Sequence, residues 1–229
     1  LISGALRNAR ESLGRKLEQS ATQKKLLKGL GETFNLQEMP TRIEVYDNSH
    51  IQGAYAVGAM VVSGPDGLMK SEYRKFNIMM EELENRDDTS MMKYVLTRRF
   101  RKKTPSQDLK IPDVIVLDGG KGQLSATVAV LKELNLYDRI PVASLAKRNE
   151  EIFIPGKSEP VILPRNSESL YLLQRIRYES NRLAITYNRQ LRKKAMKDSV
   201  LDGVNGLGPS RRARLIKEFG SINKIRQAT

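Results

Sequence analysis

The sequence predicts an α/β protein whose mixed β-sheet is flanked by helices, followed by a small all-helical unit. Strand-like runs at 42–49, 54–63 and 70–79 follow one another with short connections, which is typical of an antiparallel meander. Further along, strand, helix and strand alternate, which is typical of parallel strands joined by crossover helices. From about residue 198, glycine-rich turns separate short helical patterns.

Length and composition narrow the class of protein. A chain of 229 residues fits one large and one small domain, at about 150 residues per domain. No apolar run approaches the roughly 18 residues of a membrane span, so we expect no membrane partner. Cysteine is absent, which excludes disulfides and thiolate metal ligands and fits the cytoplasmic location that we expect. The chain begins without Met or a secretory signal, and we interpret its start as internal to a longer protein.

The first half of the chain supplies one helix, the meander and a second helix. Residues 1–35 carry Leu and Ala at helical spacing among strong helix formers. The segment GPDG at 64–67 predicts a turn between the second and third strands. The stretch 85–100 starts with an aspartate suited to an N-cap, and we expect it to continue as a helix.

The second half supplies the parallel part of the sheet. Strands are expected at 113–118 and 140–146, with a helix at 120–134 between them, so these strands should be parallel. Residues 151–164 predict a hairpin, and 166–197 a long helix. Its apolar stripe is Leu170, Leu173, Ile176, Ala184, Tyr187 and Leu191.

Three segments follow from this order of elements. We expect a helical segment at 1–40, an α/β domain at 41–197 and a helical DNA-binding region at 198–229. The net charge of +14 is concentrated toward the end, because residues 165–229 hold fifteen Lys or Arg and five Asp or Glu, a net charge of +10. Such clustering favours a nucleic-acid partner over an inert basic surface, since each neutralised phosphate releases counterions.

Two aspartates carry the functional prediction. Asp118 ends a buried strand, where it either caps the next helix or forms part of a site at the sheet edge. Asp47 lies in the middle of a strand, where capping is not available, and a buried carboxylate needs a compensating partner. A divalent cation held by both carboxylates is one solution. In a basic protein this favours Mg²⁺- or Mn²⁺-dependent phosphodiester hydrolysis, in the arrangement of ribonuclease-H-like nucleases.

The segment DGGKGQ after the second strand is not a Walker A loop, which requires GxxxxGK[ST]. We interpret its glycines as allowing close approach of the backbone to a metal or a DNA phosphate. Lys121 is a candidate phosphate contact, and a solvated surface lysine is the equally weighted alternative.

The segment GVNGLGPSRRARLI at 203–216 is typical of a helix-hairpin-helix motif. Backbone N–H groups at the start of a helix bind phosphate without reading base sequence, and Pro209 suits the first turn of that helix. The alternative is a helical turn that closes the domain. The DNA-binding candidates in this tail are Gly206, Gly208, Arg211, Arg212 and Arg214.

Long segments of the chain resemble the C-terminal half of the UvrC family of excision-repair endonuclease subunits. They are YDNSHIQGAYAVGAMVV, KSEYRKFNI, DDTSMMKYVLTRRF, PDVIVLDGGKGQL, LPRNSESLYLLQRIR and LDGVNGLGPSRRARLIKEFGSI. The resemblance implies a ribonuclease-H-like domain that incises damaged double-stranded DNA 5′ to the lesion in nucleotide excision repair, followed by tandem helix-hairpin-helix motifs. It also implies a UvrB–DNA complex as partner, with UvrA acting earlier. The family's N-terminal nuclease domain has no counterpart in this sequence.

The resemblance also implies four catalytic positions. The metal-binding aspartates correspond to Asp47 and Asp118, and an acidic residue at the start of a helix corresponds to Asp88. The family's histidine position is Asn181, and an acidic position shortly before it is Tyr178. Asn cannot act as a base near neutral pH, so the expected endonuclease has reduced activity. The alternative function is a catalytically degenerate DNA-binding module.

Overall fold

The computed structural model describes residues 2–51, 55–101, 110–146, 150–202, 204, 207–219, 225 and 228. The chain divides into two compact units, which are Leu1–Ile185 and Thr186–Thr229. The division falls inside the longest helix, earlier than residue 197, where the sequence analysis placed the end of the α/β domain. Residues 1–40, which the sequence analysis set apart, belong to the first unit.

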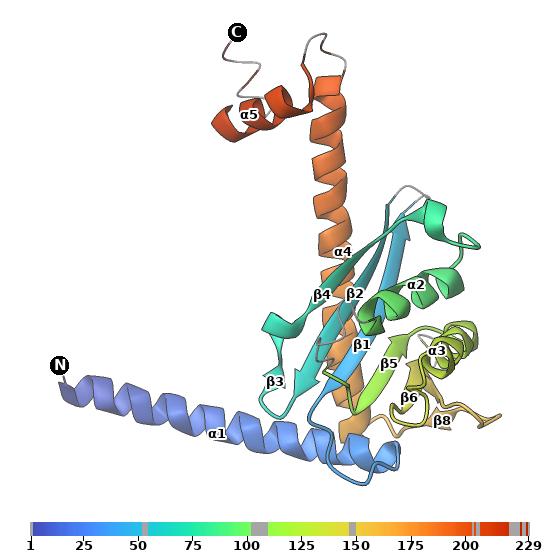
Figure 1. Ribbon diagram of the computed structural model, residues 1–229. Helices are drawn as coiled ribbons and strands as arrows, with labels where there is room; N and C mark the ends of the chain where they lie inside the picture. The colour runs from blue at the N-terminus through green and yellow to red at the C-terminus, as the bar shows by residue number, and fades with distance from the viewer. Residues whose placement is uncertain are drawn as a thin grey trace. The chain divides into compact units, whose positions relative to one another are not determined.

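One mixed sheet of eight strands forms the centre of the first unit, as far as the structure describes it (Figure 1). The order is β3-β2-β1-β5-β6-β7-β8, and β4 also pairs with β2, on the edge away from β1. Pairs β1–β2 and β2–β4 are antiparallel, and pairs β1–β5 and β5–β6 are parallel, which confirms the predicted mixed sheet. The strands are β1 (Ile43–Ile51), β2 (Tyr55–Gly64), β3 (Gly67–Leu68), β4 (Arg74–Ile78), β5 (Val114–Asp118), β6 (Val142–Leu145), β7 (Glu151–Phe153) and β8 (Val161–Ile162).

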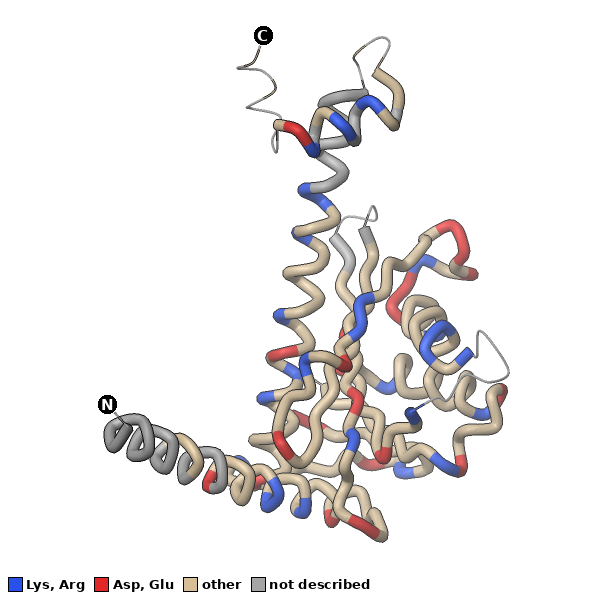
Figure 2. Tube along the Cα trace, turned by 60° about the vertical axis from the view of Figure 1, so that its left-hand side comes forward, with Lys and Arg blue, Asp and Glu red and all other residues tan. Residues whose placement is uncertain are grey.

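Helices cover both faces of this sheet. The pair α2 and α3 lies on one face, and the first half of α4 lies on the other (Figures 1 and 2). The helices are α1 (Ile2–Thr33), α2 (Asp88–Phe100), α3 (Lys121–Glu133), α4 (Glu168–Asp202) and α5 (Pro209–Phe219), with 3₁₀ turns at Lys70–Glu72 and Met80–Glu82.

Two expected boundaries were displaced. The strand expected at 70–79 begins only at Arg74, because the 3₁₀ turn at Lys70–Glu72 closes with the N–H of Tyr73 on the carbonyl of Lys70. The helix expected at 85–100 begins at Asp88, because the carboxylate of Asp87 accepts the N–H of Ser90 at 2.7 Å and caps it.

The main core lies between the sheet and the helices α2 and α3. Tyr46 and Met60 of the sheet pack there with Met92 and Leu96 of α2. At Gly58 the helix comes very close, since a Cβ there would lie 2.5 Å from Cγ2 of Val95. A side chain at that position would push α2 away from the sheet.

The opposite face is covered by the end of α1 and the first half of α4. Buried apolar residues on these helices include Leu26, Leu27 and Leu30 on α1, and Leu170, Leu173, Ile176 and Ala184 on α4. Gln23 of α1 donates to Oγ of Ser63 at 3.3 Å and to the carbonyl of Gly64 at 3.1 Å, both at the end of β2. Four members of the apolar stripe predicted for the long helix, Leu170, Leu173, Ile176 and Ala184, are thus buried in the core.

Candidate active site

The two candidate aspartates lie side by side at one end of the central parallel strands. The register pairs Ile43 with Val114 and continues to Tyr46 with Leu117. The next residues along the two strands are Asp47 and Asp118. Asp47 lies inside β1 and Asp118 is the last residue of β5, as the sequence analysis expected.

Both aspartates point toward the face covered by α4. Side chains alternate along a strand, and Tyr46 and Leu117 belong to the core beneath α2 and α3. Their successors therefore point to the other face. Both carboxylates are buried, with 4% of Asp47 and 5% of Asp118 exposed. Two neighbouring carboxyl groups on one face are the kind of oxygen ligands that a divalent cation binds.

A hydrogen-bond clamp at the other end of the strands sets this register. One carboxylate oxygen of Asp113, just before β5, accepts the N–H of Thr41 at 2.7 Å, the hydroxyl of Thr41 at 2.9 Å and the N–H of Arg42 at 2.9 Å. The N–H of Asp113 donates to the carbonyl of Arg42 at 2.9 Å. Because the strands start together, they reach Asp47 and Asp118 together.

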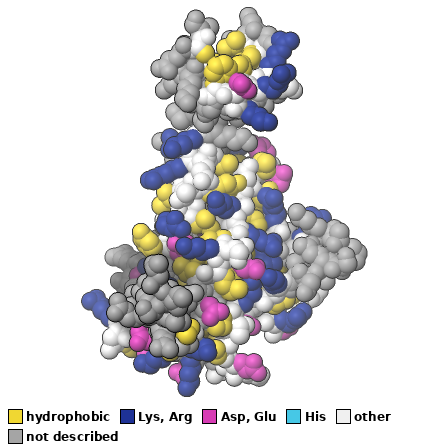
Figure 3. Space-filling view, turned by 90° about the vertical axis from the view of Figure 1, so that its left-hand side faces the viewer, with side chains coloured by type: hydrophobic (Ala, Val, Ile, Leu, Met, Phe, Trp, Pro, Cys, Tyr) yellow, Lys and Arg dark blue, Asp and Glu magenta, His cyan; other side chains and the backbone are white. Residues whose placement is uncertain are grey.

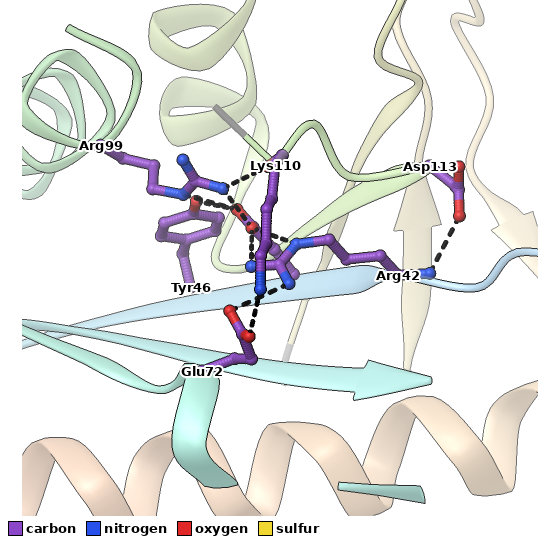
Figure 4. Close-up of polar contacts among 7 residues, drawn as sticks. Arg42, Tyr46, Glu72, Arg99, Lys110 and Asp113 are labelled. Carbon is purple, nitrogen blue, oxygen red and sulfur yellow. Dashed lines mark hydrogen bonds and ion pairs between the residues drawn. The ribbon is translucent and has the colours of Figure 1, made fainter. Parts of the chain in front are cut away.

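A buried ion cluster, which the sequence analysis did not identify, holds β1 to α2 (Figure 4). Glu44 of β1 accepts from Arg99 of α2 at 2.6 and 3.2 Å, from the hydroxyl of Tyr46 at 2.6 Å and from Arg42 at 2.9 Å. The side chains of Glu44 and Arg99 are 0% and 1% exposed. Burial, and next the charge of Glu44, raise the pKa of Tyr46 well above its ordinary value. The sequence signal for this cluster was Glu44, a charged residue inside the predicted strand RIEVYD.

Of the glycines after Asp118, Gly119 has a structural reason for its small size. Gln123 folds back over the turn, and its side-chain oxygen accepts the N–H of Gly120 at 3.1 Å. A Cβ at Gly119 would overlap that oxygen. A Cβ at Gly122 would lie 3.6 Å from the hydroxyl of Thr89, so the first turns of α2 and α3 are neighbours. Close approach of these glycines to a metal or a phosphate stays a prediction.

Asp88 lies at the start of α2, next to that contact, and is exposed. Its neighbour Asp87 is the helix cap, and the hydrogen bond from Ser90 lowers the pKa of the Asp87 carboxyl. Within the described part of the chain, no three Asp, Glu or His residues form a group that could hold a metal ion. The structure therefore joins Asp47 to Asp118 and leaves Asp88 outside that pair.

Asn181 lies half-buried on the flank of α4. One turn earlier on that flank, Arg177 binds Glu150 through two hydrogen bonds of 2.6 and 2.8 Å. Glu150 follows β6, whose Leu145 pairs with Asp118. The ion pair therefore holds this flank of α4 near the end of the sheet that carries the aspartates.

Two residues close to Asn181 in sequence, Tyr178 and Glu179, are not available as further ligands. Tyr178, at the family's acidic position, is 73% exposed. Glu179 is bound by Arg182 through two hydrogen bonds of 2.7 and 2.8 Å, and this hydrogen bonding is the main reason why its pKa is lowered.

The donor set fits a hard divalent cation. Mg²⁺ takes oxygen ligands, keeps several waters and often binds through one or two carboxylates. Asp47 and Asp118 provide two carboxylates on one face, and the amide oxygen of Asn181 is a further donor on the adjacent helix.

The DNA-binding candidates lie in both units. In the first unit, Lys121 is the first residue of α3 and is exposed. In the second unit, α5 begins at Pro209 as expected, and Gly208, Arg211 and Arg214 are exposed. Gly206 and the side chain of Arg212 lie outside the described residues, and the helix-hairpin-helix motif stays a prediction. None of the described helices is long and apolar enough to cross a membrane.

The mixed sheet and its paired aspartates define a ribonuclease-H-like endonuclease domain. Residues 31–185 match the model of the UvrC RNAse H endonuclease domain, and the chain belongs to this family.

Curated relatives share the whole length of the chain. The UvrABC system protein C of Maricaulis maris is 45% identical over 238 residues, and that of Paramagnetospirillum magneticum is 48% identical over 238 residues. All of this chain is covered, against 37% and 38% of those proteins, so the chain spans little more than a third of their length. Among solved structures, a variant of Ciona intestinalis Endonuclease V in complex with inosine-containing DNA is 12% identical, with a TM-score of 0.43, over 78% of this chain and 98% of that one.

Proposed function

We propose that the first unit hydrolyses a phosphodiester bond of damaged double-stranded DNA, on the 5′ side of the lesion, within a UvrB–DNA complex formed after UvrA has acted. One observation carries this proposal: Asp47 and Asp118 are the next residues in register on two parallel strands, buried on one face. Family membership and the relatives in UvrABC systems support the nuclease class and the repair pathway.

The two aspartates bind the metal and orient the reacting phosphate. Mg²⁺ or Mn²⁺ bound there supplies Lewis acidity, which favours attack by water and stabilises the leaving oxygen. Because Asp47 and Asp118 are fixed on adjacent strands, their carboxylates need little rearrangement on binding, which lowers the entropic cost of aligning the phosphate.

Residues around the pair have supporting roles in this proposal. Asn181 holds a water or phosphate oxygen by hydrogen bonding, and its amide transfers no proton near neutral pH. Lys121, in the first turn of α3, contacts a phosphate with support from the helix dipole. Asp88, the first residue of α2, is proposed as a catalytic residue only because of the family resemblance.

DNA affinity comes mainly from charge. Lys and Arg side chains are spread over the face shown in Figure 3, with fewer Asp and Glu among them. In the second unit, exposed Arg211 and Arg214 lie on the first turns of α5. Binding of this kind is independent of base sequence and falls steeply with salt concentration.

A second candidate function is a DNA-binding module that has lost catalysis. Asn181 at the family's histidine position favours it, since an imidazole that transfers protons contributes about 10²–10⁴ in rate. In this case the aspartate pair would be retained without cleavage of DNA.

A nicking assay separates the two candidates. The chain is mixed with UvrA, UvrB and a duplex that carries one defined lesion, with Mg²⁺, with Mn²⁺ or with EDTA. Metal-dependent nicking 5′ to the lesion that is lost in Asp118→Asn supports the endonuclease. DNA binding without nicking under every metal condition supports the module and rules out the endonuclease.

A further inference from the structure

A groove of about 530 Å³ lies between α3 and the hairpin of β7 and β8. One stripe of α3 forms one wall, since Lys121, Ser125, Val128 and Lys132 recur at helical spacing. The full lining is Lys121, Leu124, Ser125, Val128, Lys132, Tyr137, Phe153, Ile154, Pro155, Gly156, Lys157 and Ser158.

The charge of this groove is of one sign. Its lining, over the part of the chain that the structure describes, contains three lysines and neither Asp nor Glu. Two of the ammonium groups lie over aromatic rings, Lys121 at 4.9 Å from the centre of Phe153 and Lys132 at 5.1 Å from the centre of Tyr137. These cation–π contacts orient the lysines without neutralising their charge.

The groove begins at the end of the sheet that carries the candidate active site, on the face opposite the two carboxylates. Lys121 follows Asp118 by three residues, and Lys132 lies eleven residues further along the same helix. At 1.5 Å per residue, the two lysines are about 16 Å apart along the helix axis. A stacked DNA strand advances about 3.4 Å per nucleotide, so the groove is long enough for several nucleotides.

We propose that this groove binds single-stranded DNA, as a short unpaired segment that leads away from the incision point. The proposal rests on the proposed nuclease function and adds a path for the strand. Lys121, Lys132 and Lys157 contact successive phosphates. As Lys121 and Lys132 turn from the rings to the phosphates, bases pack in their place against Phe153 and Tyr137, and also against the apolar floor.

The chemistry favours a single strand over other polyanions. Phosphates alone would satisfy the lysines, but aromatic and apolar residues between them match the exposed base faces of an unpaired strand. In a duplex those faces are stacked inside and would leave the apolar lining without a partner. An acidic peptide would satisfy the charges and leave the aromatic rings without stacking partners.

Binding of a labelled oligo(dT) of about twelve nucleotides, followed by fluorescence anisotropy at several salt concentrations, tests the proposal on the full chain. In Lys132→Ala/Lys157→Ala we expect affinity to fall about tenfold and the salt slope to flatten by about 1.4, because each phosphate contact on a single strand contributes about 0.7. Phe153→Leu should weaken binding about five- to tenfold with an unchanged slope, because it removes stacking and no charge.

One groove variant and two controls lie at exposed positions outside the core. Ser125→Glu places a negative charge in the groove from an exposed position, and it should weaken binding with the fold intact. Lys28→Ala and Ser71→Glu, at exposed positions outside the groove, are the matched controls. Circular dichroism on each variant identifies any loss of fold.

The proposal is overturned if groove variants bind oligo(dT) like their controls, or if duplex binding is weakened as much as single-strand binding. It is also overturned if polyglutamate binds as tightly as oligo(dT) and the same substitutions abolish that binding, which would assign the groove to an acidic protein. The readout does not depend on cleavage: groove-dependent binding in a chain that never nicks DNA would leave the groove supported and the proposed function wrong. Nicking by a chain whose oligo(dT) binding does not depend on the groove residues would support the proposed function and overturn the groove proposal.

Discussion

Asp47 and Asp118 are neighbours across the parallel pair β1–β5, because both continue a register in which partner residues differ by 71 positions, as Ile43 and Val114 do. The carboxylates share one face and are buried. In Asp118→Asn, and likewise in Asp47→Asn, we expect nicking to fall at least 10²-fold while DNA affinity changes little. One negative charge at the proposed metal site is lost in each variant and the size of the side chain is kept.

Nicking by each variant over a Mn²⁺ titration measures this effect, and anisotropy with undamaged duplex measures binding. Glu133→Gln, which removes an exposed carboxylate at the end of α3, is the control. Wild-type nicking in both aspartate variants at equal metal concentration would show that the pair is structural.

The Asp113 clamp should control both stability and activity from the far end of the strands. Asp113→Ala removes three accepted hydrogen bonds and should lower the free energy of unfolding by about 1–2 kcal/mol. Because the clamp sets the start of the register, nicking should fall as well. Asp113→Asn keeps one acceptor oxygen and should lose less of both. Urea unfolding and nicking on the same preparations measure the two effects, and equal activity in all three chains would contradict the coupling.

Removing only one partner of the buried ion pair Glu44–Arg99 should lower the free energy of unfolding strongly. Arg99→Met leaves the carboxylate of Glu44 buried with fewer partners, and we expect a loss of about 3–5 kcal/mol in the free energy of unfolding. Glu44→Leu together with Arg99→Met removes both charges and should recover most of that loss. A double-mutant cycle in urea measures the coupling, and additive single effects would show that the charges do not stabilise each other.

The cap at Asp87 predicts a dependence of stability on pH. The hydrogen bond from Ser90 lowers the pKa of the folded carboxyl below its ordinary value of 3.8. The stabilisation is therefore complete above the unfolded pKa and is lost as pH falls through the folded pKa. Relative to Asp87→Ala, the wild type should have a constant advantage in melting temperature near neutral pH, and the advantage should shrink below about pH 4. An advantage that grows in acid would contradict the sign.

Asn181→His should raise nicking by about 10²–10⁴, because an imidazole near the aspartate pair restores a group that transfers protons near neutral pH. DNA affinity should be nearly unchanged, since the position is a half-buried helix flank. Adding Asp118→Asn should abolish the gain. Tyr178→His, at a largely exposed position on the same helix, is the control. No gain in Asn181→His would show that the imidazole is not the missing group.

Local patterns in the sequence determined most of the elements. Strand and helix periodicity located the meander, the parallel strands and the apolar stripe of α4, because each depends on residues close together in the chain. The cap at Asp87 and the start of α5 at Pro209 also follow from local backbone chemistry.

Only the tertiary structure decided what these elements bring together. No local pattern specifies that β1 pairs with β5, or that Asp113 fixes the register that aligns Asp47 with Asp118. The Glu44–Arg99 pair and the lysine groove likewise join residues that are distant in sequence. The sequence by itself determined which chemical groups are present and in which local conformation, because propensities and periodicity act over a few residues. Their adjacency is decided by long-range strand pairing and burial, which depend on the whole packed core.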